Sequence, residues 1–237
     1  DPAARFTSVD TLAEAAFITM TGTAVALGLL HIRSGESQSV NYGIDILGYG
    51  GMVVAILTLV LAFNPVLTGE PIGTGWLFNA LALGYLAPAL LFGVLAWRTY
   101  PVRPYPYGLV ALGTAGILAF TWVTLMIRQT FHSNILAPGT TAIDMSDAEL
   151  YTYSIVWLVI GIGLLLAGIF LNRRLLRMVS AGLIVLVIVK VFLIDMASLT
   201  GVWRALSFIG LGIVLVGIGL LYQRLLAPAS AKPEEQT

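Results

Sequence analysis

The sequence of 237 residues has no cysteine and two histidines, and Asp, Glu, Lys and Arg together make up 10% of it. The absence of cysteine excludes disulfide bonds, thiolate zinc sites, iron–sulfur clusters and a cysteine nucleophile. About a quarter of the residues in soluble domains are charged, so this scarcity of charge excludes an ordinary soluble protein. Twelve basic residues balance twelve acidic ones, which leaves no basic excess for binding nucleic acid.

Hydrophobic residues make up 58% of the chain. They gather in seven stretches of about 20 residues, the length of helix that crosses a bilayer. The sequence therefore predicts an all-α integral membrane protein, a bundle of about seven transmembrane helices in one domain over residues 1–226. The helices are expected at about residues 11–32, 44–63, 76–97, 108–127, 148–171, 178–197 and 202–226. The tail 227–237, rich in Pro, Ala and charge, is expected to be disordered and cytoplasmic.

Local signals support some of the helix ends. Thr11-x-x-Glu14 and Ser146-x-x-Glu149 have the spacing of a capping box, in which a hydroxyl and a carboxylate bond the free backbone N–H groups at a helix start. Asn64-Pro65 is expected to end the second helix, because proline cannot continue the backbone hydrogen bonding. Pro88, inside the third helix, predicts a kink.

The distribution of basic residues predicts the orientation, because short cytoplasmic loops carry the excess of Lys and Arg. Eight of the twelve lie on one side of the membrane and three on the other, with Lys190 inside the sixth helix. The N-terminus is therefore expected outside and the C-terminus in the cytoplasm. An outer N-terminus with no signal peptide is easier to explain if an earlier part of a longer chain precedes Asp1.

Lys190 is the most deeply placed charge in the sequence, on the order of 10 Å below the outer end of the sixth helix. Two interpretations are open. Its ammonium can reach outward along its four-carbon stem, or it can point into the bundle and find a polar partner, which would make it a candidate functional residue. Asp195 lies about 140° around an ideal helix from Lys190. A direct pair is therefore not implied unless the helix end is distorted.

Asp195 and Arg204 flank the outer turn of the final hairpin at matching depths, so we expect a charge-assisted pair between them, with Ser207 nearby. This pair is better explained as a staple of the hairpin than as a catalytic group. Glu14 starts the first helix on the same side and is either a helix cap or a partner of Lys190. The candidate polar cluster is therefore Lys190, Asp195, Arg204, Ser207 and Glu14.

The two histidines are predicted on opposite sides of the membrane. His31 ends the first helix and His132 lies in an outer loop, so the pair cannot hold one metal ion or haem. No phosphate-binding loop, Ser/His/Asp set or zinc-protease helix is present. The sequence therefore predicts neither a cofactor nor a metal site.

The final hairpin resembles a known family of large bacterial membrane proteins. The resemblance is carried by Lys190-Val-Phe-Leu-Ile-Asp195, Leu199-Thr-Gly-Val-Trp-Arg204, Ser207-Phe-Ile-Gly-Leu-Gly212 and Leu221-Tyr-Gln-Arg224. It is most specific over about residues 172–226, and the family is domain of unknown function 2339. The resemblance implies a bacterial inner-membrane location and a chain that forms the last part of a longer protein. It also implies that the residues to emphasise as candidate site residues are Lys190, Asp195, Arg204 and Ser207. It implies no activity.

Three function classes stay open. An accessory or scaffold subunit explains the stripes of small residues, which allow close helix packing, and it is the function we expect. Its partners are the lipid bilayer and other transmembrane helices, from the missing part of a longer chain or from another protein. The alternative is a transporter or channel component for a small solute or lipid, with a polar pocket around Lys190. Thr19, Thr23, Asn79, Tyr85 and Lys190 are the candidate pore-lining residues. A membrane enzyme is the third class.

Overall fold

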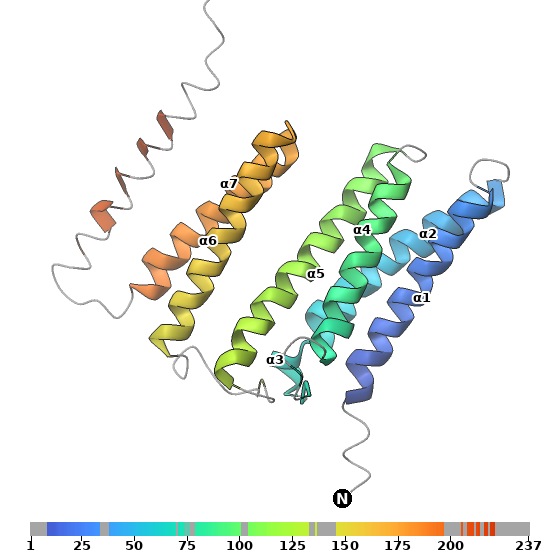
Figure 1. Cartoon of the computed structure of the whole chain (residues 1–237), viewed down its shortest axis with the longest axis horizontal. Helices are drawn as coiled ribbons and strands as arrows, with labels where there is room; N and C mark the ends of the chain where they lie inside the picture. Colours follow the sequence, from blue (N-terminus) through green and yellow to red (C-terminus); the bar gives the residue numbers. More distant parts are fainter. Residues whose placement is uncertain are drawn as a thin grey trace, which may run out of the picture. The chain divides into compact units, whose positions relative to one another are not determined.

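The structure is a computed structural model that describes most of the chain. The described residues are 9–33, 38–69, 71–73, 75, 79–100, 104–132, 136, 146–196, 205, 208–210, 212–213, 216–217 and 219–220. They contain six helices long and apolar enough to cross a membrane (Figure 1). The chain is therefore an all-α membrane protein, as the sequence predicts.

The six spans correspond to the first six predicted helices. They are Leu12–His31, Gln38–Thr68, Ala82–Thr99, Pro106–His132, Asp147–Phe170 and Arg174–Asp195. The seventh predicted helix, over 202–226, lies outside the described residues except at scattered positions between 205 and 220, and the predicted tail 227–237 lies wholly outside them.

The chain divides into two compact units, Asp1–Met145 and Ser146–Thr237. The first unit contains α1 (Val9–Arg33), α2 (Gln38–Ala55), η2 (Ile56–Ala62), α3 (Pro65–Thr68), η3 (Ala82–Leu86), α4 (Ala87–Thr99) and α5 (Tyr105–His132). The second contains α6 (Asp147–Phe170), α7 (Arg174–Lys190) and η4 (Val191–Asp195). Elements labelled η are π-helical turns, in which a backbone N–H bonds the carbonyl five residues earlier instead of four.

Three helix starts differ by four residues or more from the sequence prediction, and one of them is the sixth helix, which begins at Arg174 instead of about residue 178. The second helix begins at Gln38 instead of about residue 44, because its polar first turns continue the helix beyond the apolar run. The third span begins at Ala82 instead of about residue 76, where the Asn79 side chain accepts the N–H of Ala82 at 3.0 Å. The predicted cap of α6 is present, since Ser146 Oγ accepts the N–H of Glu149 at 3.2 Å. The side chain of Thr11 lies outside the described residues.

Close packing around one tyrosine holds α2 and α5 together in the first unit. The hydroxyl of Tyr107 donates to the carbonyl of Ile44 at 3.2 Å, and the ring lies edge-on to Tyr49 with 4.8 Å between centroids. A Cβ at Gly48 would lie 1.6 Å from the Tyr107 hydroxyl oxygen, so only glycine fits there. Around this contact α1 packs beside α2, and α4 beside α5.

The π-helical turns η2 and η3 meet through a tyrosine hydroxyl. In η2 the N–H of Phe63 bonds the carbonyl of Thr58 at 2.7 Å, which leaves the carbonyl of Leu59 without its usual helical donor. Tyr85, buried in η3, donates to that carbonyl at 2.6 Å. Lipid cannot satisfy a backbone carbonyl, so this side chain replaces the missing donor. η3 ends at Leu86, two residues before Pro88, and a π turn is one recognised cause of a helix kink.

In the second unit a tight turn joins α6 to α7. Asn172 has a left-handed backbone with φ of 49°, while the N–H groups of Asn172 and Arg173 bond the carbonyls of Ile169 and Gly168. This is the Schellman pattern that ends many helices. A Cβ at Gly168 would lie 2.8 Å from Cγ of Arg177. Glycine therefore lets the two helices approach closely at the turn.

Candidate functional site

The ammonium group of Lys190, at the end of α7, has three hydrogen-bond acceptors. Its Nζ lies 2.6 Å from Oδ1 of Asp195, 2.8 Å from Oγ of Ser154 and 3.0 Å from the carbonyl oxygen of Leu150. Three acceptors match the three N–H donors of a lysine. The Lys190 side chain is 10% exposed. It therefore points toward α6 within the second unit.

Asp195 and Ser154 complete a closed set of bonds with Lys190. Oδ1 of Asp195 accepts from Lys190, and Oδ2 accepts from the hydroxyl of Ser154. The Ser154 oxygen also accepts from Lys190, so each of the three side chains bonds the other two. The Asp195 side chain is 2% exposed. We call these three residues the lysine triad.

A distorted helix end brings Asp195 to Lys190. Residues Val191–Asp195 form η4, and the N–H of Met196 bonds the carbonyl of Val191, five residues earlier, at 2.9 Å. In a π-helical turn the residue five positions after a given residue lies about one turn above it, and five positions is the spacing from Lys190 to Asp195. The condition that the sequence set for a direct pair is therefore met.

The bonding of the triad limits the chemistry that it can perform. A serine beside a lysine can act as a nucleophile when the lysine amine takes the serine proton. Here the Ser154 hydroxyl donates to Asp195, and Lys190 directs its N–H groups at Asp195, Ser154 and the Leu150 carbonyl. Lys190 is thus a donor to Ser154 and offers it no free lone pair. The arrangement matches a buried ion pair that joins two helices.

Comparison with known proteins places the chain in a family. The family model described as "Predicted membrane protein (DUF2339)" matches residues 3–225. The chain belongs to the DUF2339 family. The match confirms the resemblance in the final hairpin and extends it across both units. No curated protein and no solved structure matches the chain.

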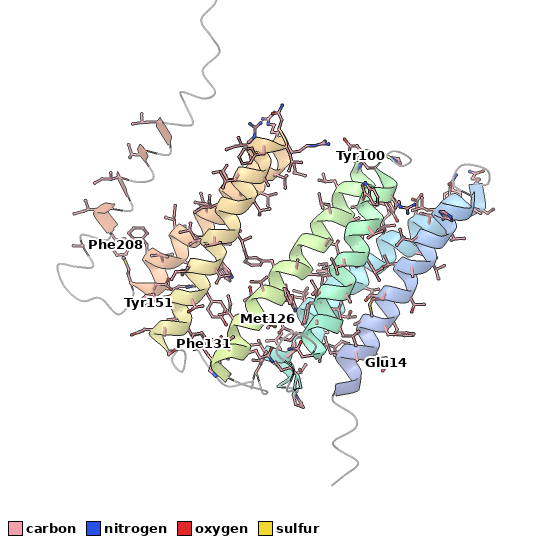
Figure 2. All side chains as sticks on the ribbon, viewed as in Figure 1. Glu14, Tyr100, Met126, Phe131, Tyr151 and Phe208 are labelled. Atoms are coloured by element: carbon pink, nitrogen blue, oxygen red, sulfur yellow. The ribbon has the colours of Figure 1, made fainter. Side chains whose placement is uncertain are left out.

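The lysine triad of this DUF2339 protein contains two of the five residues in the candidate polar cluster, Lys190 and Asp195. Glu14 is exposed on α1, in the first unit (Figure 2), and its pairing with Lys190 stays a prediction. Arg204 and Ser207 lie outside the described residues. The expected pair between Asp195 and Arg204 therefore also stays a prediction.

Sequence reasoning missed Ser154, the third member of the triad. It is a single hydroxyl in a long apolar helix, and serines in such helices commonly bond their own backbone. The signal that could have found it is its position on α6, seven residues after the start at Asp147. Lys190 lies five residues before the end of η4 at Asp195. Because α7 and η4 run antiparallel to α6, the start of α6 and the end of η4 lie at the same end of the hairpin, and Ser154 and Lys190 lie at similar depths from it.

The other candidate polar residues of this DUF2339 chain bond within the first unit. Thr19 and Thr23 are buried, and their hydroxyls donate to carbonyls of α1 itself. The Asn79 amide donates to Oε1 of Gln129 at 2.7 Å, and the Gln129 amide donates to the carbonyl of Gly75 at 3.1 Å. These bonds tie the segment before η3 to α5.

The histidines are far apart along the first unit, with His31 near the end of α1 and His132 at the end of α5. Among the residues that the structure describes, no group of three or more His, Asp or Glu side chains is placed to hold a metal ion.

Proposed function

We propose that this DUF2339 chain is an accessory or scaffold subunit of the membrane, whose spans pack against other transmembrane helices. The observation that carries the proposal is a set of helix faces that present glycine with no atom within 4 Å of the position of a Cβ among the described residues. The three side chains of the lysine triad bond one another, and the buried Thr19 and Thr23 bond their own helix. The buried indole N–H of Trp122, in the span Pro106–His132, has no hydrogen-bond partner.

The described glycines include two contrasting groups, those with a close neighbour and those with none. At Gly48, Gly161 and Gly168 a Cβ would come within 3.0 Å of another part of the same unit, so internal packing explains them. At a second group of helical glycines a Cβ would meet nothing within 4 Å among the described residues. They are Gly22, Gly28, Gly50, Gly93, Gly113, Gly116, Gly163, Gly182, Gly210, Gly212, Gly217 and Gly219. Small residues on a membrane helix let a second helix approach its backbone closely.

The face of α5 around Gly116 is the best defined of these surfaces. Gly113 and Gly116 are exposed beside the exposed side chains of Leu112 and Ile117. Positions three and four apart share one face of a helix. Glycine in a helix costs about 0.5–1 kcal/mol relative to alanine, and close approach of a partner helix would offset that cost.

We place the protein in the bacterial inner membrane, with its N-terminus outside and its C-terminus in the cytoplasm. The distribution of Lys and Arg supports this orientation. The family resemblance supports the location. We propose further that residues 1–226 form one transmembrane domain followed by a disordered cytoplasmic tail.

Substitution of Gly116 tests the scaffold proposal. Gly116→Leu should weaken association of the protein with its native membrane assembly by about tenfold or more, equivalent to about 1.4 kcal/mol, because the larger side chain keeps a partner helix away. Thermal stability of the purified chain should not fall, since a Cβ at Gly116 meets nothing within 4 Å. Native gel electrophoresis of solubilised membranes measures the assembly. Gly116→Ala is the matched control and should assemble normally, and an unchanged assembly with Gly116→Leu would reject α5 as the packing face.

Transport of a small solute or lipid is the second candidate, because a buried ion pair in a span is a feature of ion and proton pathways. In this chain the buried ion pair is the one between Lys190 and Asp195. The test is proton influx into liposomes that contain the purified protein, followed with an internal pH-sensitive dye. Influx above that of empty liposomes, lost in Lys190→Met, would favour transport. Liposomes as tight to protons as empty ones would argue against a proton pathway through the Lys190–Asp195 pair.

A further inference from the structure

The π-helical turn η4 begins directly after the first charge of the lysine triad, Lys190, and its fifth and last residue is the second charge, Asp195. α7 is regular up to Lys190, η4 covers Val191–Asp195, and Met196 closes the turn. Leu193 and Ile194 are exposed while Asp195 is buried. A regular α-helix would instead place Asp195 about 100° per residue, and so about 140° in total, away from Lys190.

We infer that the ion pair between Lys190 and Asp195 holds η4 in its π-helical form, and that loss of the pair returns residues 191–196 to α-helix. π-helical turns are rare because α-helical bonding is the more favourable default. A compensating interaction is therefore required. The bond from Lys190 to Asp195 at 2.6 Å and the bond from Ser154 to Asp195 exist only while the turn is wide.

The α-helical alternative can be described from the existing face of α7. Val187 is buried, and the residue two turns later in an α-helix is Ile194. Ile194 would thus take the buried face, and Asp195 would leave Lys190 and Ser154. The N–H of Met196 would bond the carbonyl of Phe192 in place of Val191.

The consequence of this rearrangement is a change of register. An α-helical turn accommodates one residue fewer than the π turn, so the chain after Met196 would shift by one residue, about 1.5 Å along the axis and about 100° around it. The Lys190–Asp195 pair therefore acts as a latch: it determines how far the chain after Met196 is rotated about the axis of α7. This inference rests on the geometry of the second unit alone and is independent of the scaffold proposal.

Solid-state NMR on the full chain in lipid bilayers tests the latch. The amide nitrogen of Met196 and the carbonyl carbon of either Val191 or Phe192 are labelled with 15N and 13C, and dipolar contacts report which carbonyl is bonded. The unmodified chain should show the contact to Val191. In Lys190→Met and in Asp195→Asn the contact should move to Phe192. A retained contact to Val191 in a folded Lys190→Met protein would overturn the inference.

Deletion of Leu193 is a matched second variant that preserves both charges. Asp195 then follows Lys190 by four residues, a spacing that an ordinary α-helix places on one face. The contact between Lys190 Nζ and Asp195 Cγ should persist, and Met196 should still contact Val191, now through an α-helical bond. Loss of either contact in the deletion variant would contradict the inference, even if Lys190→Met fails to fold.

Discussion

Ser154 joins the two charges of the lysine triad, and its hydroxyl is the part of the triad that can be removed most simply. In Ser154→Ala, Oδ2 of Asp195 loses a donor and Lys190 loses an acceptor in a buried site. Leaving such groups unsatisfied costs about 1–3 kcal/mol. We expect the free energy of unfolding in mixed detergent micelles to fall by that amount.

Thr152→Ala is the matched control for Ser154→Ala on the same helix. Its exposed hydroxyl bonds only the carbonyl of Ala148, at 2.7 Å, so its loss should change stability by no more than about 0.5 kcal/mol. Equal losses in the two variants would mean that the Ser154 bonds contribute no more than an ordinary helix hydroxyl.

Sequence reasoning at this scale found the two charges and left their direct pair open, but it missed the other two partners of Lys190. Lys190 and Asp195 are conspicuous because ionisable residues are costly inside a membrane. Ser154 and the carbonyl of Leu150 are not, because hydroxyls and carbonyls occur on every span. Which of them faces a lysine depends on the rotation of α6 against α7, which local patterns do not determine.

At the scale of elements, two neighbouring glycines of α2 separate internal packing from open surface. A Cβ at Gly48 would lie 1.6 Å from the Tyr107 hydroxyl oxygen, whereas a Cβ at Gly50 meets nothing within 4 Å. Gly48→Ala should therefore destabilise the protein by about 1–3 kcal/mol through overpacking. Gly50→Ala should leave stability unchanged or raise it by up to about 1 kcal/mol. Chemical unfolding of the two variants under one condition checks the difference, and a stable Gly48→Ala protein would argue against the α2–α5 packing.

Helix ends and helix distortions differ in how well the sequence predicts them. The cap at Ser146 is a local interaction across three residues, so its spacing in the sequence was sufficient. The turns η2 and η4 depend on contacts between residues far apart in the sequence. The Tyr85 hydroxyl donates to the carbonyl of Leu59, 26 positions away, and the Ser154 hydroxyl donates to the carboxylate of Asp195, 41 positions away. Periodicity assumes an ideal helix and cannot locate these departures.

At the scale of the whole molecule, composition and the length of the apolar runs were enough to predict the class. Within the second unit α6 and α7 pack side by side across one tight turn, so in a membrane the start of α6 and the start of α7 are expected on opposite sides. The Lys190 end of α7 and η4 then lies on the same side as Asp147. The distribution of Lys and Arg supports our proposal that this side is the outside, with Asp147 outside and Arg174 in the cytoplasm.

Single cysteines test this orientation cleanly, because the chain has no cysteine of its own. Asp147 and Arg174 are both exposed, at opposite ends of the α6 span. In spheroplasts, which keep only the inner membrane intact, a membrane-impermeant maleimide should label Asp147→Cys. It should reach Arg174→Cys only after that membrane is permeabilised. The reverse pattern would invert the topology and put the lysine triad near the cytoplasmic face. Labelling of both positions from the same side would mean that α6 does not cross the membrane.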